Sequence, residues 1–557
     1  MTTQPTGAIQ LMTFSNLSPS SPVGSARRRL HFVAVGVCAL LLSSSVLGRA
    51  QSGGVVVTHS GAVNFGSINV CPAGQSSPEP CSRTTKLKYS VTATTTFGDT
   101  QVVTQGLANL DFTLSATSCT NTLLAGSSCT VSATFVPRAP GVRMGAVQLL
   151  DSSGNLLSST YIYGYGQGPI ASFSPGAQRK LPVSGYDGGA VAVDAAGDVY
   201  FPDSGSIAKF DTRTGVQTTV ATGIPYAAGL AVDGAGNIYV ASGSVVKIAV
   251  DTGVQTTVGP DLNSVAGVAV DGRGNLYTGD DWDNGQGLQA YPRLAEVFAA
   301  TGGEVTLLGG DDYGLQGIPL LNYPWGVAVD GAGNAYIATF NFGPVYESIA
   351  GTKPQFEYGI IASREFESVG SFNNPFSVAV DAAGDVFVTD GGLDQDAIYQ
   401  VAANNGNETI VVNGPWQSPI AVDGAGNLFF NNGNYYAPAL AEVKGSQPAT
   451  LNFGKIAVGS TSQPQSVTIQ NVGNQPLNAV APGLIVGTGF LQVPGSGTPA
   501  DCTSSFSLAP GASCNLSLVF APQAAGIITG AATFTDNALN KIPSASQSVN
   551  LRGIGIQ

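Results

Sequence analysis

One short motif occurs six times in the middle of this 557-residue chain. Its copies read VAVDAAGDVYF, GLAVDGAGNIYV, GVAVDGRGNLYT, GVAVDGAGNAYI, SVAVDAAGDVFV and IAVDGAGNLFF, and their aspartates are Asp194, Asp233, Asp271, Asp330, Asp381 and Asp423. A repeat of roughly 40 residues, built from strand-like runs around a tight turn, predicts a radial β-array. We therefore expect an all-β fold with a six-bladed propeller.

Each copy is interpreted as a β-hairpin. Apolar alternation predicts a strand, D-x-x-G-[ND] has the composition of a turn, and Tyr or Phe with Val or Ile begins the return strand. An Asp side chain can bind the amides of its own turn, so the six aspartates are interpreted as structural rather than catalytic.

Two further strands follow most hairpins, as in IAKFDTRTGVQTTVATG, so four strands make one blade. The sixth copy is followed by ALAEVKG and then by a change in composition, which leaves its outer strand missing. The run Gln178 to Gly185 resembles that strand. We predict that this segment pairs with the last blade and closes the ring, which removes exposed edges.

These six in-register copies resemble NHL repeats, and the chain from about residue 172 to 445 is similar to six-bladed NHL propellers. The basic residues that often follow the second strand in that family are absent here. The resemblance implies a protein-binding, RNA-binding, sensor or lyase domain, so the fold does not choose among them.

The flanks repeat each other as well. VNFGSINV near Phe65 matches LNFGKIAV near Phe453, and GSSCTVSATFVPRAPG matches GASCNLSLVFAPQAAG. About 110 residues of alternating strands with Gly, Pro and Ser turns are typical of a β-sandwich. The pattern resembles immunoglobulin-like modules of the HYDIN, ASPM and SPD-2 type, called choice-of-anchor D in secreted bacterial proteins, which implies surface display or spacing.

Cysteine spacing indicates an exported protein. Cys38 lies in the leader, and the other six form the natural local pairs Cys71 with Cys81, Cys119 with Cys129, and Cys502 with Cys514. Without a C-x-x-C spacing or partner histidines, a metal site is a poor interpretation. Disulfides imply an oxidising compartment, hence the periplasm, the cell surface or the extracellular space.

The first 50 residues have the pattern of a signal peptide. Arg27 to Arg29 precede the apolar run LHFVAVGVCALLLSSSVL, and a small-x-small cleavage site ends at Ala50. An uncleaved signal anchor is the alternative. The predicted domains are the signal peptide 1–50, an immunoglobulin-like module 51–171, the propeller 172–445 and a second module 446–557. We expect no integral membrane segment after leader removal.

The charge balance disfavours nucleic acid as a partner. The chain has 35 Asp and Glu against 22 Lys and Arg, and four of those basic residues lie in the leader. Without a basic stripe, the phosphate-neutralising contribution to binding is missing.

Histidine is nearly absent, which bears on catalysis. The two histidines are His31 in the leader and His59 in the first strand region, so the propeller has none. NHL-type lyases need histidine as a metal ligand or base, and these activities are excluded. We therefore expect a protein that is not an enzyme and has no cofactor.

Calcium is the one alternative cofactor, because Asp, Glu and Asn oxygens can coordinate it in propeller hydrolases. Two acidic loops are candidates, and neither is a complete EF-hand loop. Their residues are Asp280, Asp281, Asp283 and Asn284 in one loop and Asp390, Asp394 and Asp396 in the other.

The blade topology predicts an aromatic rim. The D-x-x-G turns lie on one face, whereas the loops between the second and third strands and between blades lie on the other, where loops commonly carry function. The predicted rim residues are Trp282, Trp325, Trp416, Tyr226, Tyr323, Phe376, Tyr435 and Tyr436. Flat aromatic rings can stack on a ligand while Asp and Asn side chains hydrogen-bond to it, which favours a glycan or a protein or peptide as the ligand. The alternative is that these aromatic residues only pack adjacent blades against each other.

The sequence thus favours a secreted or surface-displayed binding protein whose modules act as display or spacer units. Two alternatives stay open: an envelope or matrix scaffold without a dedicated pocket, and a calcium-dependent propeller hydrolase.

Overall fold

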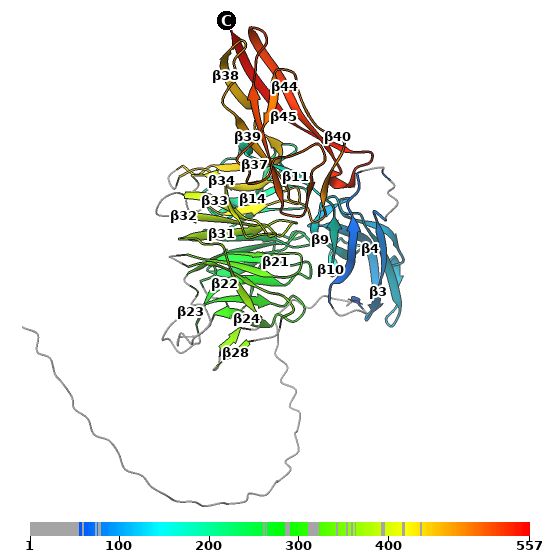
Figure 1. Ribbon diagram of the computed structural model, residues 1–557. Coiled ribbons are helices and arrows are strands. Elements are labelled where there is room, and N and C mark those ends of the chain that lie inside the picture. Colours follow the sequence, from blue (N-terminus) through cyan, green and yellow to red (C-terminus); the bar gives the residue numbers. More distant parts are fainter. Residues whose placement is uncertain are drawn as a thin grey trace, which may run out of the picture. The chain divides into compact units, whose positions relative to one another are not determined.

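The structure is a computed structural model, and Figure 1 shows its chain trace. It describes residues 55–57, 61–72, 75, 80–259, 262, 264–283, 290–309, 321, 323–340, 343–352, 355–357, 360–362, 364–391, 396–414, 418–434 and 437–557. The predicted signal peptide lies outside these residues. No helix in the described part is long and apolar enough to cross a membrane.

Six four-stranded antiparallel sheets form the propeller within the described residues, coloured from green to yellow in Figure 1. Blades 1 to 3 contain β13 (Ala192–Val193), β14 (Val199–Asp203), β15 (Ser206–Phe210) and β16 (Gln217–Thr222); β17 (Gly229–Val232), β18 (Ile238–Ser242), β19 (Ser244–Ile248) and β20 (Gln255–Val258); and β21 (Gly267–Val270), β22 (Leu276–Asp283), β23 (Ala290–Val297) and β24 (Glu304–Gly309). Blades 4 to 6 contain β25 (Pro324–Val329), β26 (Ala335–Thr339), β27 (Val345–Ser348) and β30 (Phe366–Val369); β31 (Pro375–Val380), β32 (Val386–Gly391), β33 (Asp396–Val401) and β34 (Glu408–Asn413); and β35 (Ile420–Val422), β36 (Leu428–Asn431), β37 (Leu440–Pro448) and β12 (Gly176–Lys180). A small hairpin, β28 (Gln355–Glu357) with β29 (Ile360–Ala362), is inserted in blade 4.

The blades pack face to face, which is why their inner strands are apolar on both sides. All four residues of the inner strand β17 are buried, as are Leu428, Phe429 and Phe430 of the second strand β36. Between blades 1 and 2, Tyr200 and Ile207 share one cluster with Val240. Continuous apolar runs are expected for strands covered on both faces, and burying each such side chain stabilises the fold by about 1.5–3 kcal/mol.

The ring closes as the sequence predicts. Strand β12 pairs antiparallel with β37, placing Gln178 opposite Val443 and Lys180 opposite Ala441. The observed strand begins two residues before the predicted segment and ends at Lys180. Blade 6 therefore joins both ends of the propeller segment, and neither end leaves an unpaired sheet edge at the closure.

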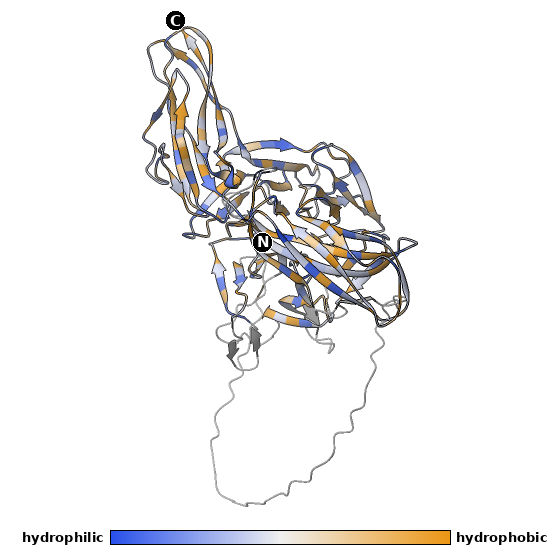
Figure 2. Ribbon diagram, turned by 90° about the vertical axis from the view of Figure 1, so that its right-hand side faces the viewer, coloured by the Kyte–Doolittle hydropathy of each residue, from blue (hydrophilic) through white to orange (hydrophobic). Residues whose placement is uncertain are grey.

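The N-terminal module, in blue in Figure 1, is a two-sheet sandwich around one core that contains Phe65, Phe112 and Phe135. One sheet has the order β1 (Val55–Val57), β3 (Arg83–Val91), β8 (Ser128–Phe135), β6 (Phe112–Thr117). The other has β2 (Val63–Asn69), β10 (Leu156–Gln167), β9 (Gly141–Asp151), β4 (Thr95–Thr104) and β5 (Leu107–Ala108), with β7 (Asn121–Leu123) beside β4. Polar and apolar residues alternate along its strands (Figure 2), as a half-buried strand requires.

The C-terminal module, in orange and red in Figure 1, has the same plan. One sheet contains β38 (Leu451–Ala457), β45 (Ala545–Ile556), β44 (Gly526–Asp536), β40 (Leu477–Val486) and β42 (Ser507–Leu508), and the short 3-10 helix η1 (Ala538–Asn540) lies between β44 and β45. The other has the order β11 (Ala171–Ser174), β39 (Gln465–Asn471), β43 (Ser513–Phe520), β41 (Phe490–Val493). In each module the second strand in chain order pairs in parallel with the last strand. These pairs are β2 with β10 and β38 with β45.

Strand β11 differs from the expected domain boundaries. It precedes the propeller in the chain, yet it pairs with β39 of the C-terminal module in the place that β1 takes beside β3. Phe173 of β11 is 3% exposed and belongs to that module's core. The propeller is therefore inserted between the first two strands of the C-terminal module. The predicted range 446–557 omits β11, and the predicted range 172–445 includes residues of β11 that belong to that module.

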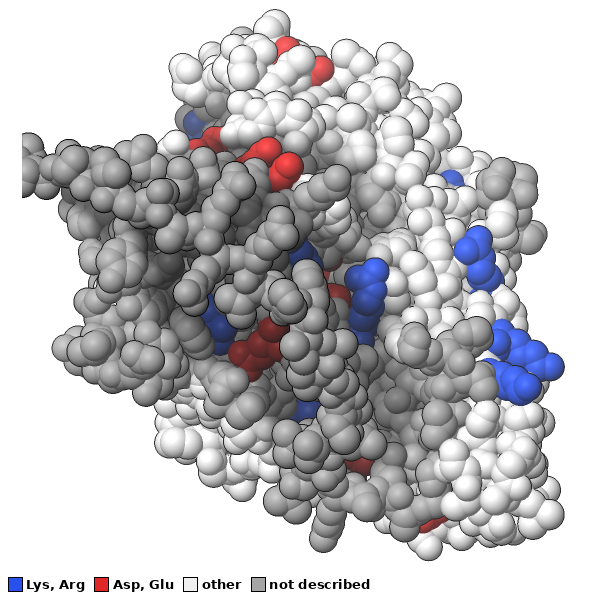
Figure 3. Space-filling view, turned by 90° about the horizontal axis from the view of Figure 1, so that it is seen from below, with Lys and Arg blue, Asp and Glu red and all other residues white. Residues whose placement is uncertain are grey.

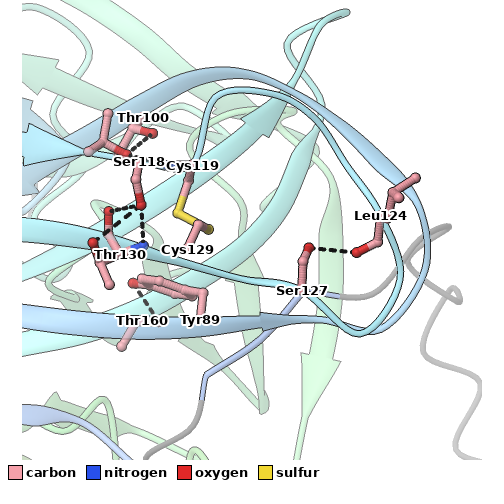
Figure 4. Close-up of a disulfide and its surroundings, with 10 residues drawn as sticks. Tyr89, Thr100, Ser118, Cys119, Leu124, Ser127, Cys129, Thr130 and Thr160 are labelled. Carbon is pink, nitrogen blue, oxygen red and sulfur yellow. Dashed lines mark hydrogen bonds between the residues drawn. A yellow bond between two sulfur atoms is a disulfide. The ribbon is translucent and has the colours of Figure 1, made fainter.

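All three predicted disulfides are present: Cys71–Cys81, Cys119–Cys129 and Cys502–Cys514. Figure 4 shows Cys119 bound to Cys129 of β8, beside a hydrogen bond from the backbone N–H of Thr130 to the Ser118 hydroxyl. Tyr89 lies nearby and donates to Thr160 at 3.3 Å, and burial raises the pKa of Tyr89 to about 12. The equivalent bridge of the C-terminal module joins Cys514 of β43 to Cys502.

Candidate functional site

The six repeat aspartates hold their own turns. In every copy the Oδ1 atom accepts the backbone N–H four residues on, at 2.8–3.0 Å. The third residue after each Asp is a glycine with φ between 78° and 90°, a conformation that costs a residue without Cβ least. These glycines are Gly197, Gly236, Gly274, Gly333, Gly384 and Gly426.

The second oxygen of the carboxylate, Oδ2, does not bind the turn amides, and its partner depends on the residue at the fourth position after the Asp. In four copies an Asn at the fourth position donates its Nδ2 to this Oδ2 atom, at 2.8–3.2 Å. Copy 1 has Asp198 there instead, and Lys209 neutralises the pair, with its Nζ 3.0 Å from Asp194 and 2.8 Å from Asp198.

Copy 5 has the two carboxylates without the cation. Gln400 stands opposite Phe387 where Lys209 stands opposite Tyr200, and it donates to Asp385 at 2.9 Å. The buried Oδ2 atom of Asp381 accepts no hydrogen bond within the described part of the chain. Burial, together with the charge of Asp385, raises the pKa of Asp381 well above its usual value, because both disfavour the charged carboxylate.

Asp381→Asn is therefore expected to stabilise the protein. The amide keeps an oxygen for the turn and places a donor beside Asp385, and we expect Tm to rise by about 2–4 °C, or ~1 kcal/mol. Because the folded-state pKa of Asp381 is raised, the wild type loses stability as pH rises through that pKa, and the variant, which keeps only Asp385 of the pair, loses less. Thermal unfolding from about pH 5 to 9 measures both effects.

Asp194→Asn is the matched control, because it removes a carboxylate that Lys209 pairs. This variant is expected to lower Tm. A lower Tm for Asp381→Asn as well would contradict the unpartnered carboxyl in copy 5.

The N-terminal module contacts the face that carries these turns, called the turn face below. Gln105 donates to the carbonyl of Val232 at 2.9 Å, and the hydroxyl of Tyr161 donates to Asp233 at 2.7 Å. Arg143, bound to the buried Asp111, also donates to the carbonyl of Ala195 at 3.3 Å. A cavity of about 600 Å³ remains between the module and the turns of blades 1, 4, 5 and 6.

The opposite ends of the inner strands open on a pocket of about 720 Å³, called the rim pocket below. Its lining includes Tyr226, Trp325 and Phe376 of the predicted rim, together with Asp187 and Asp396. A separate cavity of about 60 Å³ is lined by residues of the inner strands, among them Gly229 and Gly267, and by Trp325 and Phe376. The rim pocket itself is called the cup below.

The aromatic residues of the rim pocket have two roles. The ring of Trp325 lies 4.7 Å from that of Phe376 and 6.2 Å from that of Phe340, so it packs blade 4 against blade 5. Trp325 and Phe376 are both partly exposed toward the cup, and Tyr226 is 56% exposed. Wedge packing thus orients these rings while leaving surface for a ligand.

The other predicted rim residues are not among the described residues that line the pocket. Tyr323 is 59% exposed, has φ 44° and is not among the residues that line the pocket. Trp282 is in β22 opposite Tyr291, with its backbone alone described. Trp416, Tyr435 and Tyr436 lie outside the described residues.

Two of the candidate calcium residues, Asp280 and Asp390, have other partners, and a third, Asp396, lines the rim pocket. Asp280 is fully buried and its carboxylate meets Arg293 at 3.1–3.2 Å. Asp390 accepts the backbone N–H groups of Asn373 and Asn374 at 3.2 and 2.6 Å. Asp281 and Asp283 are in β22 with their backbone described, and Asp394 and Asn284 lie outside the described residues. Within the described part of the chain, no group of three or more His, Cys, Asp or Glu could hold a metal ion.

Sequence reasoning missed several pocket residues. Asp187, Asn431 and Asn434 line the cup but lie outside the repeated motif, Asp187 and Asn434 in loops and Asn431 at the end of β36. The signal that could have found them is positional, since each lies next to the start of an inner strand or the end of a second strand, where the rim was predicted.

Comparison with known proteins identifies one of the two flanking modules. Residues 438–542 match the family model described as ASH: Abnormal spindle-like microcephaly-assoc'd, ASPM-SPD-2-Hydin. No curated protein matches the chain. The chain thus contains an immunoglobulin-like ASH module and a β-propeller.

Solved structures with similar folds include regucalcin from Agrobacterium tumefaciens, a calcium-binding protein, at 16% identity and TM-score 0.36, covering 49% of this chain and 96% of that chain. The PQQ-bound aldose sugar dehydrogenase from Streptomyces coelicolor is 15% identical, with TM-score 0.34 and coverage of 50% and 99%. PapD-like domain 7 of human CEP192 is 15% identical, with TM-score 0.15 and coverage of 19% and 81%.

Proposed function

We propose that this protein is an exported, non-enzymatic binding protein of the NHL-propeller type, and that a glycan or an extended peptide binds in the rim pocket. The flanking modules, of the choice-of-anchor D type, act as display or spacer units. The disulfides agree with an oxidising compartment. Export then depends on the predicted signal peptide, residues 1–50.

The observation that carries this proposal is the composition of the rim pocket. Three partly exposed aromatic rings and two aspartates converge on one cup of about 720 Å³, a volume typical of ligand sites. The opposite face is covered by the N-terminal module, through the contacts of Gln105, Tyr161 and Arg143. The rim pocket lies on the propeller face away from these contacts.

A nucleic-acid ligand does not suit this chain. The face shown in Figure 3 is largely uncharged where it is described, with charged side chains scattered or in small groups. The chain as a whole carries a formal charge of −13, and phosphates would be repelled.

Trp325→Ala is expected to weaken ligand binding about tenfold or more without unfolding the propeller, because it removes the largest ring of the cup. Calorimetric titration with chitin, chitosan and cellulose hexamers and with short peptides measures the loss, and thermal unfolding reports the fold. Tyr323→Ala is the matched control, since this exposed ring lies two residues away and outside the lining. Equal affinity of the Trp325 variant and wild type would remove the rim pocket from the proposal.

A structural scaffold is the second candidate, favoured by the contacts that join the modules to each other and to the propeller. Asn540 donates to the carbonyls of Val70 and Gln167 at 2.9 Å, and Gln470 donates to Asp385 at 2.8 Å. A scaffold role predicts that no soluble ligand perturbs the tryptophan fluorescence. A calcium-dependent hydrolase, the remaining alternative, predicts turnover that a chelator removes.

A further inference from the structure

The rim pocket has an uneven charge. Of the lining residues that the structure describes, Asp187 and Asp396 are acidic and none is lysine or arginine. Asp396 is partly buried at the start of β33, and Asp187 is exposed beside Gly188 and Gly189. Both carboxylates border the same cup, so the potential inside it is negative.

Electrostatic shifts agree with this arrangement. Burial, and next the charge of Asp187, raises the pKa of the Tyr226 hydroxyl, so these two side chains are close enough to interact across the pocket wall. Burial, and next the charge of Asp390, raises the pKa of Asp396. A second carboxylate, that of Asp390, therefore lies close enough to Asp396 to interact with it.

The aromatic faces add to the same preference. Trp325, Phe376 and Tyr226 line the cup with the two carboxylates, and the negative face of an aromatic ring attracts a cation. Flat rings also stack on the apolar faces of sugars. A ligand that combines sugar rings with positive charge would use every described feature of the lining.

The lining favours a glycan over a peptide backbone. Its described residues lie in loops or near the ends of strands, such as Trp325 near the start of β25 and Phe376 near the start of β31. A peptide that adds to a sheet needs a continuous edge of unpaired N–H and C=O groups. Rings that stack on separate aromatic plates need no such edge.

We infer that the rim pocket selects glycans that carry protonated amino groups, such as glucosamine oligomers, over their neutral counterparts. This inference rests on the proposed binding function and names the ligand class for the same pocket. The amino groups pair with Asp187 and Asp396, and the sugar rings stack on Trp325 and Tyr226.

The test compares two oligomers that differ in whether their amino groups are charged or acetylated. Calorimetric titration of the full-length protein with glucosamine hexamer and with N-acetylglucosamine hexamer, at about pH 6 and low salt, is expected to show about tenfold tighter binding of the charged oligomer. Replacing both aspartates, by Asp187→Asn with Asp396→Asn, should bring the two affinities within about threefold. Asp251→Asn, an exposed aspartate outside this pocket, is the control for net charge and should leave the preference intact.

Each outcome separates the two proposals. Equal binding of both oligomers overturns the preference for charge and leaves the binding function standing. Binding of a hexalysine peptide without binding of either oligomer overturns the glycan assignment. If neither the oligomers nor the peptide bind, and tryptophan fluorescence does not change with any of them, the proposed binding function itself fails.

Discussion

Phe173→Ala is expected to unfold the C-terminal module before the propeller, although the substituted residue precedes the first propeller repeat. Phe173 is 3% exposed, pairs with Ile469 and lies 6.1 Å from the ring of Phe534 in the module's core. Truncating a buried Phe costs about 3–5 kcal/mol. Differential scanning calorimetry with limited proteolysis would show a new early transition confined to the module.

Phe298→Ala serves as the matched control, because this ring is 38% exposed on the propeller and its loss should leave every transition nearly unchanged. A fragment of residues 446–557 is likewise expected to be unfolded by circular dichroism, and a fragment with residues 168–175 joined to it to be folded. Equal stability of the two fragments would show that β11 is dispensable.

Asp280→Asn is expected to destabilise the propeller by about 3 kcal/mol, because it removes the main counter-charge of a buried guanidinium. Arg293 is buried between Asp280 and Glu304, with its Nη2 atom 3.1 Å from each carboxylate. Urea unfolding measures the loss. Combining Asp280→Asn with Arg293→Met should recover part of the stability, since the double replacement leaves no buried guanidinium without its main counter-charge.

Arg213→Ala is the control for this experiment. Arg213 pairs with Asp211 on the surface at 3.6 Å, with its side chain 85% exposed, and its replacement should cost at most ~0.5 kcal/mol. A calcium-dependent rise in Tm that Asp280→Asn abolishes would contradict the structural role and return Asp280 to the calcium hypothesis.

The repeated turn was readable from the sequence because its interactions are local. Asp233 bonds to amides two and four residues away, so residue type and spacing are enough to predict the hairpin. The disulfides were also local, at separations of 10 to 12 residues. Ring closure needed one further step. Gln178 to Lys180 precede the first copy of the motif, whereas the blade that lacked a strand is built around the last copy.

The rim pocket was predicted in part. Tyr226, Trp325 and Phe376 could be assigned to one face by counting strands, because the blade topology alternates loops between two faces. Which aromatic residues converge depends on loop conformation, and Tyr323 shows the limit: it is adjacent to Pro324 at the start of β25 but lies outside the lining. The partner of Asp280 was equally hidden, because an acidic run has the same composition with or without an opposing arginine.

The sequence by itself determined the repeat, the four-stranded blades, the closure of the ring and the disulfide pairs, since each depends on near neighbours or on counted spacing. The tertiary structure decided that the propeller interrupts the C-terminal module. Strand β11 is four residues long, ASFS, and its assignment depends on pairing with β39, which lies on the far side of the propeller in the chain. No local pattern specifies such a partner, because the free energy that selects it comes from the shared core that Phe173 enters.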